Sequence, residues 1–397
     1  MSTFDVIVVG GGPAGSAAAW SAATRGARVL ILDKARFPRD KTCGDGLTPA
    51  AVRMLERMGL GETLKRFYMA DRVRFRARDM VYETAIPRRR HHPGVCYVAP
   101  RLILDDLLLR HAAAAGAEVR DGVEVEDVVL DGGRITGVIA GEGGRSSAVH
   151  APVVIAADGA RSGLSRRAGL SPRVGGPLGT AVRVQTEADR PDVPVLEVHC
   201  DLRWKGHAVP GYGWIFPMGG GRVNVGVGLA STVETAKSPG VGPLAKQFID
   251  SLPGQWKIPP VDQLRASGQL RGAKLPMGFS LWPPWRPGIL FAGDAAGVAN
   301  PLSGAGISKA LQSGALAGKC AVEALGGDGP GDLRAYESAL RGLWGSRYAR
   351  GRWILRALSR PGVMNLATAL GIRMPMKSAA LKIVLYGPQR FARDEVY

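Results

Sequence analysis

The stretch FDVIVVGGGPAGSAAAWSAATRGARVLILDK, residues 4–34, constrains the fold of this chain more than any other. A short apolar run of the buried parallel type is followed by an alanine-rich helix and a second apolar run. Between the first run and the helix, Gly10, Gly12 and Gly15 have the GxGxxG spacing. This spacing permits a tight turn, a close approach of backbone to a pyrophosphate and contact between helix and strand. The second run ends at Asp33, whose carboxylate can accept hydrogen bonds from ribose hydroxyls, so a dinucleotide-binding domain is predicted.

Two later segments indicate which dinucleotide is bound. Each is an apolar strand that delivers an acid to its carboxyl end, VVIAADG at Asp158 and ILFAGD at Asp294. Ligands gather at this edge of doubly wound sheets, which makes Asp294 suitable for the ribitol of a flavin. A long helix then begins near Gly306 and Ile307, whose backbone amides are expected to face the electron-rich N1–C2=O edge of the flavin. Between these segments, a helix that begins at Arg101 brings a guanidinium suited to the pyrophosphate.

These segments, in this order, resemble the FAD-dependent oxidoreductases built like para-hydroxybenzoate hydroxylase, and the resemblance covers nearly the whole chain. It implies an α/β fold with a discontinuous Rossmann-like FAD-binding domain, an antiparallel-sheet substrate domain and a C-terminal helical region. The implied boundaries are 1–70, 100–172 and 288–330 for the FAD-binding domain, 71–99 and 173–287 for the substrate domain, and 331–397 for the C-terminal basic helical region. The implied cofactor contacts are Gly10, Gly12, Pro13, Ala14, Gly15, Asp33, Lys34, Cys43, Gly44, Arg101, Asp158, Gly293, Asp294, Gly304, Gly306 and Ile307.

The segment PGYGWIFPMGGGRVNVGVGLA, residues 210–230, predicts a β-hairpin with three aromatic residues on one face, Tyr212, Trp214 and Phe216. Ordinary core packing is the alternative explanation of such a face. Together with the stretch CGDGLTP, this segment resembles the geranylgeranyl reductase family, whose actinobacterial members include menaquinone reductases. The resemblance implies that Trp214, Phe216 and Pro217 contact the substrate.

The same resemblance implies an FAD-dependent reductase that saturates C=C bonds of a prenyl chain, in a polyprenyl quinone or a geranylgeranyl-type lipid, by hydride transfer from reduced flavin. An unactivated alkene also needs a proton, and the ionisable candidates for catalysis are Cys43, Asp45 and Tyr212. For Cys43, the alternative role is that of a small apolar filler. Many relatives carry an acid where this chain has Ala305, which leaves the reaction itself open. The rival hypotheses are a flavin-dependent monooxygenase of an aromatic, quinone or polyketide-like substrate, and a flavin-binding lipid carrier without enzymatic activity.

The electron donor is expected from outside the chain. No second GxGxxG follows a strand elsewhere, so we expect no resident nicotinamide domain. The reductant is then a visiting molecule such as NADPH, or a redox partner protein.

Charge suggests one further partner. The formal net charge is +18, and residues 341–393 contain eleven Lys or Arg and no acid. A basic amphipathic region of this kind suits an anionic membrane surface, although a packed helical cap with solvated arginines is the alternative. The stretch DRVRFRARD, residues 71–79, is expected to be an edge or surface strand with a solvated cationic face. No motif that reads DNA or RNA accompanies the charge, so no nucleic acid is expected.

The four cysteines lie at wide spacings and the histidines lack ligand spacing, which predicts no metal site and a reducing compartment. The chain also lacks a basic leader and a run of 18 apolar residues. We therefore expect a cytoplasmic protein, with peripheral contact at the inner face of the cell membrane as the refinement.

Overall fold

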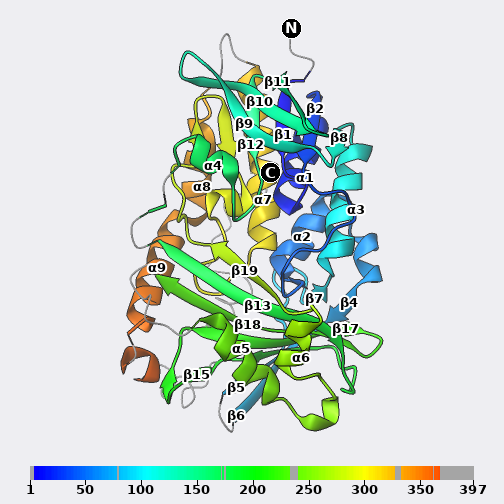
Figure 1. Ribbon diagram of the computed structural model, residues 1–397, viewed down its shortest axis with the longest axis vertical. Coiled ribbons are helices and arrows are strands. Elements are labelled where there is room, and N and C mark those ends of the chain that lie inside the picture. Colours follow the sequence, from blue (N-terminus) through cyan, green and yellow to red (C-terminus); the bar gives the residue numbers. More distant parts are fainter. Residues whose placement is uncertain are drawn as a thin grey trace.

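The computed structural model of the protein describes residues 4–77, 80–170, 172–173, 176–232, 240–326, 332–360 and 362–366. Two large sheets lie toward opposite ends of the molecule, and long helices cover the sheet that contains β1 and β12 (Figure 1). The basic tail beyond residue 366, for which a helical region was predicted, lies outside the described residues.

The first sheet has the strand order β20-β21-β12-β1-β2-β8 and is parallel except for β20. Its central strands are short apolar runs buried on both faces, as parallel strands covered by helices must be. β1 and β2 come from the first 33 residues, whereas β20 and β21 come from residues 285–291, and β12 lies between the two pairs. The bounds are β1 (Val6–Val9), β2 (Val29–Asp33), β8 (Glu118–Asp121), β12 (Val153–Ala156), β20 (Trp285–Arg286) and β21 (Ile289–Phe291).

Helices α1 (Pro13–Ala23), α3 (Arg101–Ala114) and α7 (Ile307–Leu325) belong to this part of the molecule. Glycines let α7 approach the backbone of α1. A Cβ at Gly314 would lie 2.0 Å from the carbonyl oxygen of Ala14, and one at Gly318 would lie 2.2 Å from that of Ala18. The Ser21 hydroxyl closes the contact by donating to the carbonyl of Ala315 at 2.7 Å. Small residues on both helices therefore hold the two glycine turns of the cofactor domain close to each other.

The second sheet has the order β19-β13-β18-β17-β14-β5-β6 and is antiparallel except where β14 lies beside β5. Helices α5 (Val241–Asp250) and α6 (Val261–Ala266) contribute Phe248, Ile249 and Leu264 to a buried cluster with alternate residues of its central strands. The strand bounds are β5 (Arg72–Ala77), β6 (Met80–Ala85), β13 (Pro177–Glu187), β14 (Val195–His199), β17 (Gly211–Gly219), β18 (Arg222–Thr232) and β19 (Arg271–Pro276).

Smaller elements complete the described chain. A three-stranded sheet is built from β3 (Gly46–Leu47), β7 (Cys96–Val98) and β4 (Tyr68–Ala70), and another from β11 (Arg145–His150), β10 (Arg134–Glu142) and β9 (Glu124–Asp131). The strands β15 (Arg203–Trp204) and β16 (His207–Ala208) pair with each other. The remaining helices and turns are α2 (Pro49–Arg57), η1 (Glu62–Arg66), α4 (Gly163–Arg167), η3 (Gly254–Trp256), η4 (Gly293–Ala296), α8 (Arg334–Leu340), the π-helical η5 (Arg341–Gly345) and α9 (Ser346–Leu358).

The predicted fold class is confirmed, with a Rossmann-like sheet, a largely antiparallel sheet and C-terminal helices. The domain boundaries themselves stay a prediction. None of the helices in the described ranges is long and apolar enough to cross a membrane.

The expectation for residues 71–79 is corrected in one respect. β5 is not an edge strand, because β14 pairs with one side of it and β6 with the other. Its arginines are also engaged by acids rather than simply solvated. Arg74 and Arg76 lie 3.3 Å and 2.8 Å from the carboxylate of Glu197, which is buried between them.

Candidate active site

The glycine turn after β1 has the geometry of a dinucleotide cradle. Gly10 has φ +102°, and a Cβ there would lie 2.4 Å from the carbonyl oxygen of Ala157. A Cβ at Gly15 would lie 1.7 Å from the carbonyl oxygen of Gly10, so this position also requires glycine. The N-terminus of α1 has no capping side chain and no acid in its first turn, with Pro13 at its start. Its first amides and partial positive charge are therefore suited to a pyrophosphate.

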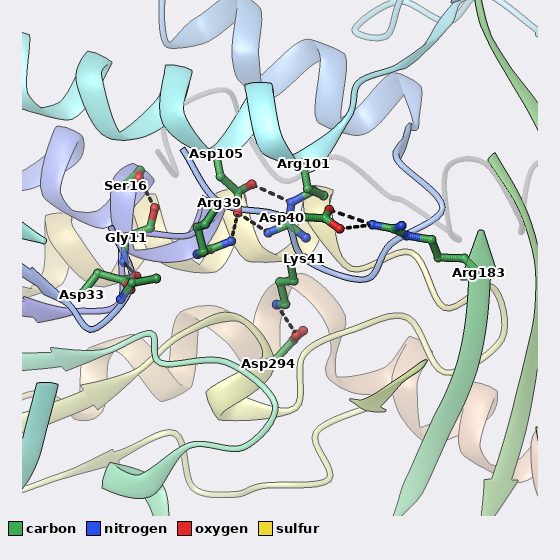
Figure 2. A network of polar contacts seen from close by, with 11 residues as sticks. Gly11, Ser16, Asp33, Arg39, Asp40, Lys41, Arg101, Asp105, Arg183 and Asp294 are labelled. Carbon is green, nitrogen blue, oxygen red and sulfur yellow. Dashed lines mark hydrogen bonds and ion pairs between the residues drawn. The ribbon is translucent and has the colours of Figure 1, made fainter. Parts of the chain in front are cut away.

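Asp33 braces this turn. Its carboxylate accepts hydrogen bonds from the backbone amides of Gly11 at 2.7 Å and Ala35 at 2.8 Å (Figure 2). Its contact with a ribose stays a prediction. The neighbouring Lys34 side chain is 73% exposed and lies 3.5 Å from Glu124, in a solvated ion pair.

Two acids stand at the carboxyl ends of adjacent parallel strands, Asp158 after β12 and Asp294 after β21. Asp158 accepts from the backbone amide of Leu164 at 3.3 Å through Oδ2, whereas its buried Oδ1 has no hydrogen-bond partner among the described residues. Burial raises the pKa of Asp158. A buried polar atom without a partner fits a ligand that supplies one. Asp294 lies 3.2 Å from the ammonium of Lys41.

The loop before α7 supplies a second free helix N-terminus. Gly306 precedes the helix without a capping side chain, and no acid lies in the first turn. Gly304 has φ +66°, and a Cβ there would lie 3.7 Å from the hydroxyl of Tyr212. That hydroxyl donates a hydrogen bond to the carbonyl of Ser303 at 2.8 Å, which fastens the loop to β17. Glycine cradles, an unpartnered buried acid oxygen and two uncapped helices together fit FAD.

The remaining predicted cofactor contacts are placed as follows. Ala14 and Ile307 are buried in α1 and α7. Gly293 has φ +62°, and a Cβ there would lie 2.8 Å from the Cβ of Ala14. The lack of a side chain at Gly293 therefore lets the turn after β21 approach the start of α1. Gly12 is more open, with Arg39 Nη2 the near neighbour of its Cβ position at 3.4 Å.

The guanidinium of Arg101 is engaged by an acid of its own helix. It donates to both oxygens of Asp105 at 2.6 Å, and Arg39 donates to the same carboxylate at 2.8 Å (Figure 2). Asp105 is fully buried and the Arg101 side chain is 5% exposed. Although burial opposes it, the Asp105 carboxylate keeps the pKa of Arg101 above its usual value. The predicted role of Arg101 at the pyrophosphate stays untested, and Arg39 is the guanidinium beside the glycine turn.

Residues 39–46, which end in the first residue of β3, form a connection between the two large sheets that we call the clamp loop. Several parts of the chain hold it. Asp40 pairs with Arg183 of β13 through both oxygens at 2.7 Å, and Lys41 points toward Asp294 (Figure 2). The carbonyl of Asp45 accepts from the amide of Ala99 at 2.8 Å. The clamp loop is therefore tied to both sheets at once.

Asp45 is the most unusual residue of the clamp loop. It has φ +60° and a fully buried side chain. Its Oδ2 accepts hydrogen bonds from the side-chain amides of Gln185, which is very close, and Asn224 at 2.7 Å. Its buried Oδ1 has no hydrogen-bond partner within the described ranges. Burial raises the pKa of Asp45 to about 6, against the opposing effects of Asn224, Arg183, Gln185 and Arg101.

The hairpin of β17 and β18 presents Tyr212, Trp214 and Phe216 on one face, as predicted. Trp214 is almost fully buried, and Gly226 opposite it leaves the room, since a Cβ there would lie 2.3 Å from the indole. The indole N–H donates to Asn224 Oδ1 at 2.9 Å.

The two glycines of the CGDG stretch face these aromatic rings. A Cβ at Gly44 would lie 3.3 Å from Trp214, and one at Gly46 would lie 3.1 Å from Phe216. They thus let the clamp loop lie against the aromatic strand, while the flavin contact of Gly44 stays a prediction. Pro217 is not brought to this site with the aromatics, because strand alternation points it to the opposite face, where it pairs with Val223.

The three candidates for proton transfer differ in acidity. Cys43 is half-buried, and desolvation and the Asp45 carboxylate raise the pKa of its thiol, with Arg101 opposing. Burial raises the pKa of Tyr212 to about 12. Among these three, Asp45 has the pKa suited to releasing a proton near neutral pH.

Sequence reasoning missed the polar residues that hold the clamp loop. The stretch PRDK, one residue before CGDG, gave a signal of charge near the site, and the alternation of β18 placed an amide on the aromatic face. The missed residues are Arg39, Asp40, Lys41, Asp105, Arg183, Gln185 and Asn224.

In the described part of the chain, no group of three or more His, Cys, Asp or Glu is arranged to hold a metal ion.

The chain is similar to known FAD-binding proteins over most of its length. The FAD binding domain family matches residues 3–342. A menaquinone reductase of Mycolicibacterium smegmatis is 36% identical over 384 residues, covering 96% of this chain and 90% of the relative. Digeranylgeranylglycerophospholipid reductase 1 of Methanopyrus kandleri is 35% identical, covering 81% of each chain.

Two solved structures share the fold. A geranylgeranyl bacteriochlorophyll reductase-like protein from Thermoplasma acidophilum has a TM-score of 0.80 at 24% identity, covering 98% of each chain. A myxobacterial chondrochloren halogenase has a TM-score of 0.69 at 24% identity, covering 96% of this chain and 93% of that one. At this identity the likeness extends to the fold alone.

The buried Asp45 carboxyl makes stability depend on pH. The pKa of Asp45 is about 6 in the folded protein and 3.8 in its ordinary state, so the folded protein binds this proton more tightly than the unfolded chain does. As pH rises from 4 to 6, ionisation of Asp45 therefore lowers the free energy of unfolding. Above pH 6 this loss is on the order of 2 to 3 kcal/mol. We therefore expect the melting temperature of FAD-loaded Asp45→Asn, relative to the unsubstituted protein, to be higher at pH 7.5 than at pH 4.

Calorimetry at the two pH values measures this difference, and exposed Asp131→Asn is the matched control. A relative melting temperature of Asp45→Asn that stays constant with pH would contradict the raised pKa.

Proposed function

The chain belongs to the geranylgeranyl reductase family of FAD-dependent oxidoreductases, and from that membership we propose that it saturates C=C bonds in the prenyl chain of a lipid. The substrate is a polyprenyl quinone or a geranylgeranyl-type lipid. The names of the relatives, menaquinone reductase and digeranylgeranylglycerophospholipid reductase, support this substrate class. The observation that carries the proposal is a buried carboxyl with one unpartnered oxygen, beside the aromatic face of β17.

When bound, reduced FAD supplies the hydride that adds to one alkene carbon. The chain itself must bind FAD, hold the alkene and bring a proton to the second carbon. The proposed cradle for FAD consists of the glycine turn at α1, the carboxylates at the ends of β12 and β21, and the amides at the start of α7. The product gains one hydride and one proton. An external reductant such as NADPH, or a redox partner protein, restores the two electrons.

The substrate side of the site is apolar. Trp214 and Phe216 offer aromatic surface to a prenyl chain, which has no polar group to recognise. We expect the same rings to exclude water when a prenyl chain is bound, which favours a proton donor built into the protein. Asp45 is the proposed donor. Cys43 is the proposed neighbour of the reacting carbons, and the Tyr212 hydroxyl, which donates to Ser303, is proposed to hold the wall of the site.

The reaction type can be tested on the purified protein with NADPH, oxygen and candidate prenyl lipids. We expect mass spectrometry to show a gain of two hydrogen atoms per double bond reduced. A gain of one oxygen without saturation would instead establish the monooxygenase alternative. Bound FAD that no donor ever turns over would favour a lipid carrier.

The proposed donor can be tested by comparing Asp45→Asn with Cys43→Ala. Asp45→Asn should keep FAD and lose turnover by about 100-fold or more, because general acid catalysis contributes about that much. Cys43→Ala should keep FAD and lose or redirect alkene reduction. Single-turnover kinetics, with flavin absorbance as the check on loading, measure both. Unchanged turnover in Asp45→Asn would refute the role of Asp45, and unchanged product in Cys43→Ala would return Cys43 to a packing role.

We also propose that the enzyme contacts an anionic membrane surface through α9, at the inner face of the cell membrane. α9 exposes Trp353 by 71% and Ile354 by 36%. Residues 341–366 contain no acid, and the segment exposes Arg350, Arg356 and Arg360, while Arg341 pairs with Glu337 at 2.7 Å. Apolar side chains among cations suit the interface of an anionic bilayer, where each cation contributes about 1 kcal/mol.

Vesicle sedimentation tests this contact. The protein should bind vesicles that contain anionic phospholipid, bind neutral vesicles weakly and lose binding as salt rises. Trp353→Ser should weaken binding by about tenfold, because a large apolar side chain no longer enters the interface. Leu130→Ser, at a site 63% exposed on β9, is the control. Equal loss in both variants, or equal binding to neutral vesicles, would refute the surface.

A further inference from the structure

Three neighbouring strands bring one row of side chains to the clamp loop. In the register of the sheet, Gln185 of β13 lies opposite Asn224 of β18, and Asn224 lies opposite Phe216 of β17. Cross-strand partners on one face lie within contact distance of each other. Both amides of this row donate to the same oxygen of Asp45, Oδ2.

The orientation of the Asn224 amide follows from its three partners. The indole N–H of Trp214 can only donate, so the atom 2.9 Å from it must be the amide oxygen. The amide nitrogen then faces two acceptors, the carbonyl of Cys43 at 2.9 Å and Asp45 Oδ2 at 2.7 Å. Trp214 thus fixes which end of Asn224 meets the carboxyl.

Two donors on Oδ2 decide where a proton can sit. An amide N–H needs a lone pair, and two such donors leave Oδ2 as the accepting oxygen of the carboxyl. The proton of the neutral acid therefore resides on Oδ1, the oxygen without a partner among the described residues. Oδ1 is therefore the buried oxygen whose hydrogen-bonding capacity none of the described residues uses.

We propose that Gln185 and Asn224 are positioning residues that reserve Oδ1 of Asp45 as the proton-donating atom, with Trp214 as the residue that orients Asn224. This inference rests on the proposed role of Asp45 in alkene reduction. It adds Gln185 and Asn224 as residues that act through Asp45, and it gives Trp214 a second role beside its proposed contact with the prenyl chain. It also explains why, among the described residues, two neutral amides and no cation donate to this buried acid.

The amides also set how readily Asp45 releases its proton. Hydrogen bonds to the ionised form favour it, and so do the cations that face the group, Arg183 from β13 and Arg101 from α3. Cys43, from the same loop, is the other titratable group that interacts with Asp45. Tyr212 of β17 interacts in turn with Cys43. With these charges unchanged, loss of one amide donor must make the acid weaker.

The test is the pH profile of alkene reduction by FAD-loaded protein. Since the donor must be protonated, the rate of a single turnover should fall as pH rises through about 6. In Gln185→Met, which keeps the length of the side chain and removes the donor, this falling limb should move upward by about one pH unit, a tenfold change in proton affinity. The control is Thr186→Val on the opposite face of β13, which should leave the limb in place.

A second variant tests whether Trp214 orients the Asn224 amide. Trp214→Phe removes the indole N–H and frees the Asn224 amide to turn, so the limb should again move upward although no partner of Asp45 has changed. This variant also stands if Gln185→Met does not fold.

An infrared readout is independent of turnover. The carboxyl stretch of Asp45, obtained as the difference from Asp45→Asn in oxidised protein without substrate, should disappear with a midpoint that rises in Gln185→Met. This inference would be overturned if neither the falling limb of the pH–rate profile nor the infrared midpoint moves in Gln185→Met while Asp45→Asn still loses turnover. The proposed function would then remain intact. Full turnover in Asp45→Asn would instead overturn the role of Asp45 on which both depend.

Discussion

The site depends on one buried carboxyl that no cation of the described residues contacts directly. Asp45 is fully buried, and its hydrogen bonds come from two neutral amides on the second sheet. Its backbone belongs to the clamp loop, which Asp40 and Lys41 tie to Arg183 and Asp294. Cofactor domain and substrate sheet therefore meet through one short loop, and a displacement of either would leave the acid without its donors. Burying an acid at such a joint is costly, and the ion pairs around it hold the joint together.

The cations near the site are divided between holding the loop and tuning the acid. Arg39 of the clamp loop pairs with the buried Asp105 of α3 and so holds that helix against the loop, while Arg101 pairs with the same carboxylate from within α3. Arg183 binds Asp40 directly and influences Asp45 from farther away. The carboxyl of Asp45 thus feels positive charge without forming an ion pair, which leaves its pKa near the pH at which a proton must be released.

Much of the fold was predictable from the sequence, and the site only in part. The glycine spacing, the apolar runs and the acids at strand ends are local patterns, so the cofactor sheet and the aromatic hairpin could be predicted from them. Gln185 could not, because its role comes from the register of β13 against β18 and from a loop 140 residues away in the chain. Arg101 has the position expected for a pyrophosphate contact, yet the acid one turn later in its own helix, Asp105, engages it.

The backbone of Asp45 limits how this chain can vary. With φ at +60°, the position favours glycine, asparagine and aspartate over other residues, because a larger or branched side chain would be strained there. Of those three, aspartate alone carries an acid. A drifting sequence could keep the loop conformation with asparagine or glycine while losing the proton donor, but it could not easily exchange the aspartate for glutamate. The loop conformation and the acidic function of Asp45 can therefore be lost independently of each other. A single codon change to asparagine or glycine would remove the acid and keep the conformation of the loop.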